Sequence, residues 1–339
     1  MSHRPRVVVI TPVFNEEESL EEYAAAVRRV LLARTDIDFE ILLVDDGSED
    51  SSWQIIRQLA TEDRRFRGIR LSRNFGSHTA LTAGLAHAGD DIDAAATLAC
   101  DLQDPPDVVL EFVRAWQSGA QIVWGQRLSR EDHRWKVMAS RVFTTALERY
   151  AMPRESLFTT GSFLLIDRRV LECFNQFKEH NRITFALVAW TGFDQVRVPY
   201  NRKARTTGTS GWNFGKMIKA MYDAFIGLST VPIRLMKLAA GTAFVLSTLL
   251  VVYLAFRAIT GTSVPGWASQ MMLLSAFFGV QFSLMGIVGE YLHRIYTESM
   301  RRPLYFISRT TDEQERTFPP LPAPVADLTA PATTPPPRR

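Results

Sequence analysis

Apolar and polar positions follow two different rhythms over the first 200 residues. Short runs rich in apolar and β-branched residues alternate with stretches of helical periodicity. The runs predict strands at 7–14, 39–45, 94–101, 121–127 and 162–166, and the periodic stretches predict helices at 16–33, 51–60, 79–88 and 105–116. This alternation predicts an α/β fold around a sheet, in which ligands bind beyond the carboxyl ends of the strands.

Two helix starts carry capping signals. Asn15 is followed three residues later by Glu18, the spacing of a capping box. Asp104 is followed by Pro105, as expected for an N-cap with proline at the first helical position. We therefore predict that helices begin directly after Asn15 and Asp104.

Two later stretches contain no charged residue, residues 238–256 and 268–289. Each is close to the ~20 residues that a helix needs to cross a bilayer. A short segment with Pro265 and Gly266 separates them. The pattern predicts a hairpin of two transmembrane helices, and the alternative is a pair of buried core helices in a soluble protein.

Basic residues flank this predicted hairpin on the outside, whereas the segment between its helices offers only Arg257. The positive-inside rule then places both ends in the cytoplasm. We expect a multi-pass protein of the cell (inner) membrane with a cytoplasmic catalytic domain. Ser275, Gly279 and Ser283 recur every four residues, a spacing that favours close helix packing and, as a bolder hypothesis, a homo-oligomer.

Composition narrows the class of protein. The 39 Lys and Arg residues nearly balance 36 Asp and Glu residues, so the net charge of +3 does not indicate a nucleic-acid partner. Two cysteines and six scattered histidines exclude a disulfide scaffold and a Cys/His zinc site of recognisable spacing. The first residues lack the apolar core of a signal peptide.

Polar and acidic residues follow several predicted strands. Asp45 and Asp46 end the second, and Asp101 and Gln103 lie at the end of a later one. In an extended chain Asp101 and Gln103 point to the same side. Such oxygen ligands suit Mg²⁺ or Mn²⁺, which completes its shell with water and phosphate oxygens. Taken singly, residues 46–48 indicate only a turn and Asp104 only a helix cap. Polar and acidic residues follow several strands, however, and this repetition favours a site for a metal-bound diphosphate.

Four motifs in this order resemble the polyisoprenyl-phosphate group of inverting family 2 glycosyltransferases. They are TPVFNEE at 11–17, VDDGS at 44–48, LSRNFG at 71–76 and DLQDPP at 101–106. The similarity continues through GSF at 161–163 and YNRKAR at 200–205 into the hairpin, and so covers about residues 6–300. The resemblance implies a Rossmann-like GT-A fold with a C-terminal membrane hairpin.

The resemblance also implies site residues. Nucleotide-sugar contacts fall on Pro12, Phe14, Glu16, Asp45, Asp46 and Asp101, and the metal ligands on Asp101 and Gln103. The residues implied to bind the acceptor phosphate are Arg127, Arg141 and Arg205, and the implied catalytic residues are Asp101, Arg127 and Arg141. One departure is Ala99, where relatives usually carry a first aspartate, and this leaves the donor preference open.

The positions of several basic residues also suggest roles that do not depend on the family resemblance. Arg134 and Arg141 lie seven apart and share a helical face, and Arg202 and Lys203 belong to a second basic segment. For Arg134, Arg202 and Lys203, a solvated surface or attraction to anionic lipid headgroups is an equal alternative to acceptor binding.

These observations predict five regions. Residues 1–210 form the catalytic domain, 211–235 amphipathic juxtamembrane helices, and 236–292 the two transmembrane helices. Residues 293–317 form a cytoplasmic juxtamembrane segment, and 318–339 a disordered tail rich in proline.

The expected reaction needs no strong base. A lipid monophosphate with a second pKa near ~6 already carries a nucleophilic oxygen at neutral pH. We expect inverting transfer of a hexose, glucose from UDP-glucose, to a polyprenyl phosphate such as undecaprenyl phosphate. The alternatives are transfer of mannose or an amino sugar to the same lipid, and a catalytically silent scaffold that binds the sugar nucleotide.

Overall fold

The protein was analysed as a computed structural model that describes residues 4–128, 163–180, 182–202, 231–260 and 266–312. Arg141 and Arg205, which the sequence assigns to the acceptor phosphate, lie outside these residues, as does most of the expected juxtamembrane segment 211–235.

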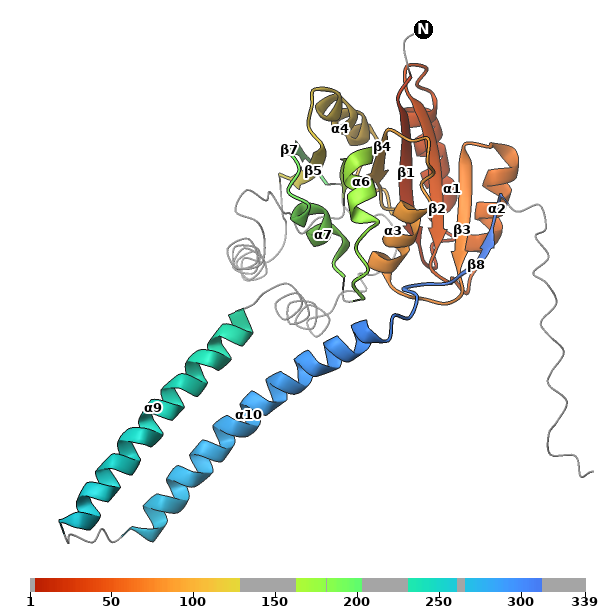
Figure 1. The fold of residues 1–339 in the computed structure, drawn as a ribbon. Helices are drawn as coiled ribbons and strands as arrows, with labels where there is room; N and C mark the ends of the chain where they lie inside the picture. The colour runs from red at the N-terminus through yellow and green to blue at the C-terminus, as the bar shows by residue number, and fades with distance from the viewer. Residues whose placement is uncertain (1–3, 129–162, 181, 203–230, 261–265, 313–339) are drawn as a thin grey trace, which may run out of the picture.

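In the described residues, one mixed sheet of eight strands forms the centre of the N-terminal domain (Figure 1). Its spatial order is β7-β5-β6-β4-β1-β2-β3-β8. The strands are β1 (Arg6–Val13), β2 (Asp38–Asp45), β3 (Phe66–Leu71), β4 (Ala94–Thr97), β5 (Ile122–Arg127), β6 (Leu164–Asp167), β7 (Gln195–Tyr200) and β8 (Ile307–Thr310). This confirms the expected α/β fold.

The direction of the strands decides where a site can lie. Strand β1 pairs in parallel with β2 and β4, β2 pairs in parallel with β3, and β5 pairs in parallel with β7. Only β6 and β8 run antiparallel to their neighbours. The carboxyl ends of β1 to β5 and of β7 therefore meet at one rim of the sheet, which we call the carboxyl rim.

Helices cover both faces of the sheet. One face packs against α1 (Leu20–Val27), the π-helical turn η1 (Arg28–Leu32), α2 (Ser52–Glu62) and α4 (Asp107–Gln117). The other face packs against α3 (Ser77–Ala86), α6 (Arg168–Phe174) and α7 (Thr184–Trp190). Strand β1 alternates accordingly, since Val7 and Val9 face the first core and Val8 and Ile10 the second. Burial on both sides explains its nearly continuous apolar sequence.

Both predicted helix caps are wrong. Helix α1 begins only at Leu20, and Asn15 has a positive φ of 54°. Helix α4 begins at Asp107, with Pro106 as its N-cap residue. The side chains of Asn15 and Asp104 are used by distant segments instead, as described below, and so they do not cap the helices that follow them.

The sequence pattern missed three strands, β3, β7 and β8. Charged residues interrupt the apolar pattern of β3, and β7 contains Pro199, which is tolerated because β7 is an edge strand. Strand β8 comes from the segment expected to be juxtamembrane. It closes the other edge, where the Thr311 N–H donates to the Gly68 carbonyl at 2.9 Å and the Ser72 N–H to the Phe306 carbonyl at 2.9 Å.

Two long helices, α9 (Val231–Ile259) and α10 (Trp267–Ser299), extend away from the sheet domain in Figure 1. At its end α10 returns to the domain, where the Glu298 carboxylate accepts a hydrogen bond from the His180 N–H at 2.7 Å. We expected two membrane spans in this region. In the part of the chain that the structure describes, no helix is both long enough and apolar enough to cross a membrane.

Candidate active site

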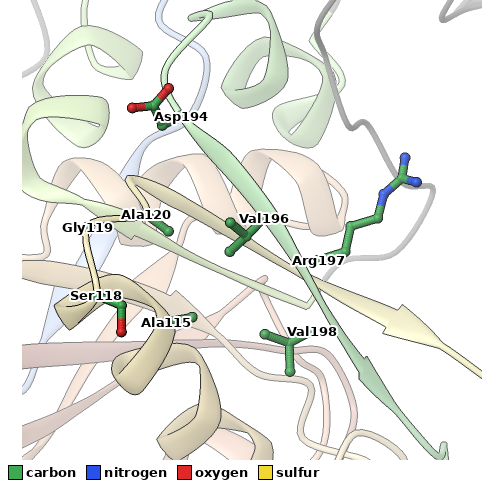
Figure 2. Close-up of a pocket in the computed structure, with 8 residues that line it drawn as sticks. All are labelled: Ala115, Ser118, Gly119, Ala120, Asp194, Val196, Arg197 and Val198. Carbon is green, nitrogen blue, oxygen red and sulfur yellow. The ribbon is translucent and has the colours of Figure 1, made fainter.

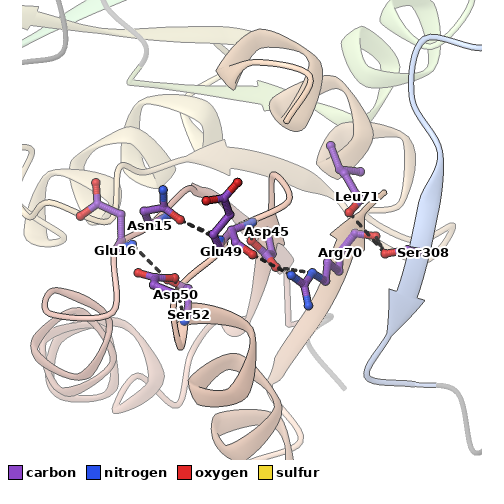
Figure 3. Close-up of polar contacts among 10 residues, drawn as sticks. Asn15, Glu16, Asp45, Glu49, Asp50, Ser52, Arg70, Leu71 and Ser308 are labelled. Atoms are coloured by element: carbon purple, nitrogen blue, oxygen red, sulfur yellow. Dashed lines mark hydrogen bonds and ion pairs between the residues drawn. The ribbon is translucent and has the colours of Figure 1, made fainter. Parts of the chain in front are cut away.

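The loops that follow β1 and β2 at the carboxyl rim are joined by hydrogen bonds (Figure 3). The Asn15 N–H donates to Ser48 Oγ at 3.0 Å, and Asn15 Oδ1 accepts from the Glu49 N–H at 2.9 Å. The Glu16 N–H donates to Ser52 Oγ at 3.0 Å. The motif asparagine therefore fastens one loop to the other, which explains why it does not cap α1.

Asp45 ends β2 with a fully buried carboxylate. Its Oδ1 accepts from the Ser48 N–H at 2.9 Å, and its Oδ2 lies 3.1 Å from Arg70 Nε. Arg70 also donates to the Ser48 carbonyl at 2.7 Å. A buried carboxylate needs such a counter-charge, so Arg70 on β3 stabilises both Asp45 and the turn that follows it.

Asp46 fastens this turn to the loop after β3. Its two carboxylate oxygens accept from the Phe75 N–H at 2.8 Å and the Gly76 N–H at 2.9 Å. Burial raises the pKa of Asp46, and these two hydrogen bonds oppose the rise. Gly47 has a φ of +72°, and a Cβ there would lie 2.5 Å from the backbone of Arg73. The two loops thus approach too closely for any residue but glycine.

The three candidate nucleotide ligands in and after the end of β1, all from the TPVFNEE motif, differ in exposure. Phe14 is 43% exposed at the end of β1, so its ring is open to a ligand, whereas Pro12 and Glu16 are half-buried. Glu16 accepts a hydrogen bond from Ser19 Oγ at 3.1 Å. An exposed aromatic ring at a strand end is suited to stacking against a nucleobase.

Glu16 and Asp101 approach the same buried thiol. Burial raises the pKa of Cys100 well above its usual value, and the negative charges of Glu16 and Asp101 add to the rise. The first motif and the DLQDPP motif, 85 positions apart in the chain, therefore each bring a carboxylate near Cys100. This is the convergence at one rim that the sequence predicts.

Asp101 and Gln103 lie in a turn and not in a strand. Strand β4 ends at Thr97, Leu102 has a positive φ of 51°, and the Gln103 N–H donates to Asp101 Oδ1 at 3.2 Å. Cys100 is buried, whereas Asp101, Leu102 and Gln103 are all half-buried, and Leu102 packs against the core. We call residues 101–103 the acidic turn. The extended segment that the sequence predicts up to Asp101 is therefore wrong, since β4 ends at Thr97 and a turn follows.

The acidic turn fits a divalent cation that is shared with a ligand. It offers one carboxylate and one amide oxygen. The residues that the structure describes include no group of three His, Cys, Asp or Glu side chains that could hold a metal ion. A Mg²⁺ or Mn²⁺ ion bound here would therefore take most of its ligands from phosphate and water.

Asp104 belongs to a buried network that sequence reasoning missed. Its Oδ1 accepts from the Tyr200 hydroxyl at 2.6 Å, and Arg127 Nε donates to the same hydroxyl at 3.3 Å. Burial and the nearby Asp104 carboxylate raise the pKa of Tyr200 to about 12, so its hydroxyl keeps its proton at neutral pH. The side chains come from three segments, and no spacing in the sequence links them.

Arg202 completes this network at the end of β7. Its Nε lies 3.3 Å from Asp104 Oδ1, and its side chain is 30% exposed while that of Asp104 is buried. Arg202 therefore compensates the charge of a buried carboxylate. This contact accounts for the presence of a basic residue at position 202. Acceptor binding, one of the roles that the sequence left open for Arg202, is not needed to explain it.

Arg127, the described member of the predicted acceptor set, lies at the carboxyl rim. It ends β5, and its register partner is Tyr200 at the end of β7. The acidic turn leads directly into Asp104, so the network connects a predicted acceptor residue to the residue next to the predicted metal ligands. Arg141 and Arg205 are outside the described residues.

A shallow cleft of about 430 Å³ lies elsewhere (Figure 2). It is lined by the end of α4, the turn at 118–120 and the start of β7, including Asp194 and Val196. Because β5 and β7 both begin at this side, the cleft lies at the opposite end of these strands from Arg127 and Tyr200. It is not part of the candidate site.

The chain is similar in sequence to a known protein family and to several individual proteins. The family profile described as "Glycosyl transferase family 2" matches residues 8–174. An uncharacterized glycosyltransferase of Synechocystis sp. is 34% identical over 88% of this chain and 94% of its own length. The undecaprenyl-phosphate 4-deoxy-4-formamido-L-arabinose transferase of Enterobacter sp. (strain 638) is 34% identical over 90% of this chain and 93% of its own.

A solved structure with partial likeness is the mannosyltransferase PcManGT from Pyrobaculum calidifontis, in complex with GDP-Man and Mn²⁺. It shares 19% identity over 86% of this chain and 88% of its own, with a TM-score of 0.44.

Proposed function

Because the chain belongs to glycosyl transferase family 2, we propose that it transfers a sugar from a nucleotide sugar to a polyprenyl phosphate at a membrane surface. The relative from Enterobacter sp. is named for a transfer to undecaprenyl phosphate, and its similarity extends over nine-tenths of both chains. Undecaprenyl phosphate is therefore the acceptor that we propose.

The observation that carries this proposal is the hydrogen-bonded chain from Arg127 through the Tyr200 hydroxyl to Asp104, the residue that directly follows the acidic turn. A transferase for a phosphate acceptor must hold a nucleotide diphosphate and a second phosphate close together, and it must compensate both charges. The acidic turn suits a cation that would compensate the diphosphate. Arg127, joined to Asp104 through Tyr200, supplies positive charge beside it.

The residues have separate roles in the proposed reaction. Asp101 and Gln103 would hold Mg²⁺ or Mn²⁺, and the bound ion would neutralise charge on the diphosphate of the leaving nucleotide. Phe14 and Glu16 contact the nucleotide, while Asp45 and Asp46 shape its loops through the contacts described above. Arg127, with Arg141 and Arg205, orients the acceptor phosphate. The phosphate oxygen attacks the anomeric carbon from the side opposite the leaving group, so the configuration inverts.

We also propose that the helical hairpin anchors this site to a bilayer, because the acceptor is a lipid. The support comes from the uncharged stretches at 238–256 and 268–289 and from the exposure of large apolar side chains on both helices. Leu249 is 61% exposed, Phe256 64% and Phe282 68%. Side chains of this kind are stable against lipid and not against water.

UDP-glucose is the donor we propose first, with the amino sugar of the relative and mannose as alternatives. The test is incubation of the purified full-length protein with radiolabelled sugar nucleotides, Mn²⁺ or Mg²⁺, and undecaprenyl phosphate in phospholipid–detergent micelles. We expect a lipid-extractable labelled product with one donor. If calorimetry detected nucleotide binding while no donor gave a labelled lipid, the chain would act as a binding scaffold and not as this enzyme.

A further inference from the structure

Tyr200 lies where the two halves of the site meet. Its side chain is 4% exposed and packs edge to face against Phe163, with 5.3 Å between ring centroids. Its backbone pairs with Arg127 in the parallel ladder of β5 and β7, and the Leu128 N–H donates to its carbonyl at 2.9 Å. Core packing and sheet pairing together determine where its hydroxyl lies.

The Tyr200 hydroxyl makes one hydrogen bond to Asp104, next to the acidic turn, and one to Arg127, at the end of β5. It donates to Asp104 Oδ1 at 2.6 Å and accepts from Arg127 Nε at 3.3 Å. Asp104 directly follows the acidic turn, so a displacement of Asp104 also moves Gln103. The contact to Arg127 uses Nε, and a guanidinium has two further nitrogens that can bind a phosphate in a forked geometry.

We propose that Tyr200 is a positioning residue that holds Arg127 in register with the acidic turn, so that acceptor phosphate and metal-bound diphosphate meet at the correct distance. The inference rests on the proposed function and assigns a role to Tyr200, which is not among the site residues that the sequence predicts. Reaction between two bound groups is sensitive to displacements of about 1 Å, which makes a shared hydroxyl an effective means of alignment.

A purely structural role is the competing explanation. In that case the hydroxyl would only satisfy the buried carboxylate of Asp104, and its loss would lower stability without changing how the remaining folded enzyme handles metal or acceptor. The two explanations therefore differ in what happens to KM and to metal binding in the folded protein.

The test is Tyr200→Phe in the full-length protein, which keeps the ring packing and removes only the hydroxyl. We expect a fall in kcat/KM for undecaprenyl phosphate of about 10-fold, the size typical of one charge-assisted hydrogen bond. We also expect a higher KM for the acceptor and a higher Mn²⁺ concentration for half-maximal activity. The matched control is Tyr305→Phe, since Tyr305 lies against His87, far from β7, and should leave both values unchanged.

A binding measurement gives a second readout that does not need turnover. Calorimetric titration with UDP and, in parallel, GDP should show weaker binding by Tyr200→Phe in the presence of MnCl₂ and unchanged binding in EDTA. Equal binding to wild type in both conditions, together with wild-type acceptor KM, would overturn the proposal. This titration also separates the two hypotheses, because it reports on Tyr200 even if no polyprenyl phosphate is ever glycosylated.

A double-mutant cycle tests whether Tyr200 acts through Arg127. If it does, adding Tyr200→Phe to Arg127→Gln should change acceptor KM by less than twofold, whereas the same change in wild type raises it severalfold. Fully additive effects of the two substitutions on acceptor KM would contradict the proposed route through Arg127.

Discussion

The hydroxyl of Tyr200 donates a 2.6 Å hydrogen bond to Oδ1 of Asp104, a residue 96 positions earlier in the chain. The bond joins the carboxyl end of β7 to the loop that follows β4, across the antiparallel strand β6 and the strand β5. It therefore connects the part of the rim that carries the acidic turn to the part that carries Arg127.

The position of the Tyr200 ring depends on Gly125 in β5. A Cβ on Gly125 would lie 2.9 Å from Tyr200 Cε1 and 3.1 Å from Phe112 Cζ. We predict that Gly125→Ala displaces the ring, lowers the stability by about 1–3 kcal/mol through overpacking, and reduces transfer more than stability explains. The comparison is Gly119→Ala, where no atom lies within 4 Å of the added Cβ but φ is +110°. If Gly119→Ala lost as much transfer at equal stability, the ring displacement would not be the cause.

Removal of the Asp101 carboxylate should abolish transfer. Asp101→Ala takes away a proposed ligand of the divalent ion, and we expect at least a 100-fold loss of kcat, because the charge of the leaving diphosphate would be poorly compensated. Asp107→Ala, at an exposed position at the start of α4, is the control and should keep wild-type activity. Full activity of Asp101→Ala would show that the acidic turn does not hold the metal.

Asp46→Asn should loosen the two loops without unfolding the sheet. An amide keeps one acceptor oxygen and presents N–H groups to the other backbone donor, so either the Phe75 or the Gly76 N–H loses its partner. We expect a stability loss of about 1–3 kcal/mol in thermal unfolding, together with weaker nucleotide binding. Asp36→Asn removes an exposed partner of Arg34 and should be nearly silent.

Strand β8 should be needed for stability although it follows the helical hairpin. A chain ended after residue 302 loses β8 and the hydrogen bonds that it makes at the edge of β3, whereas a chain ended after residue 312 keeps them. We expect the shorter chain to unfold at a temperature several degrees lower or to aggregate, because its sheet edge is open. Equal melting temperatures for the two chains would show that β8 adds nothing to the sheet.

His78 should make the fold sensitive to mild acid. Burial lowers the pKa of His78, so the unfolded chain takes up a proton at a higher pH than the folded one. The free energy of unfolding should therefore be fully retained above about pH 6.5 and fall as the pH drops below it. His78→Gln should reduce this loss between pH 7.5 and 5.5, measured by thermal unfolding. The exposed His293→Gln is the control and should leave the pH profile as in wild type.

The sequence alone was sufficient for the α/β fold class and for the presence of polar loops at the strand ends. Both follow from local rules, since periodicity reports which face of a segment is buried, and motifs such as VDDGS and DLQDPP report where strands end in polar loops. The shared orientation of Asp101 and Gln103 stays a prediction, because it assumed an extended chain where the structure has a turn.

Only the tertiary structure decided which partner each polar side chain uses. Asn15 and Asp104 both match local capping patterns, yet Asn15 bonds to Glu49 and Asp104 to Tyr200, because each side chain is closer to a donor from another strand's loop than to the helix that follows it. Strand β8 and the Tyr200 network depend on which strands lie side by side, and contacts at that separation in the chain leave no periodic trace in the sequence.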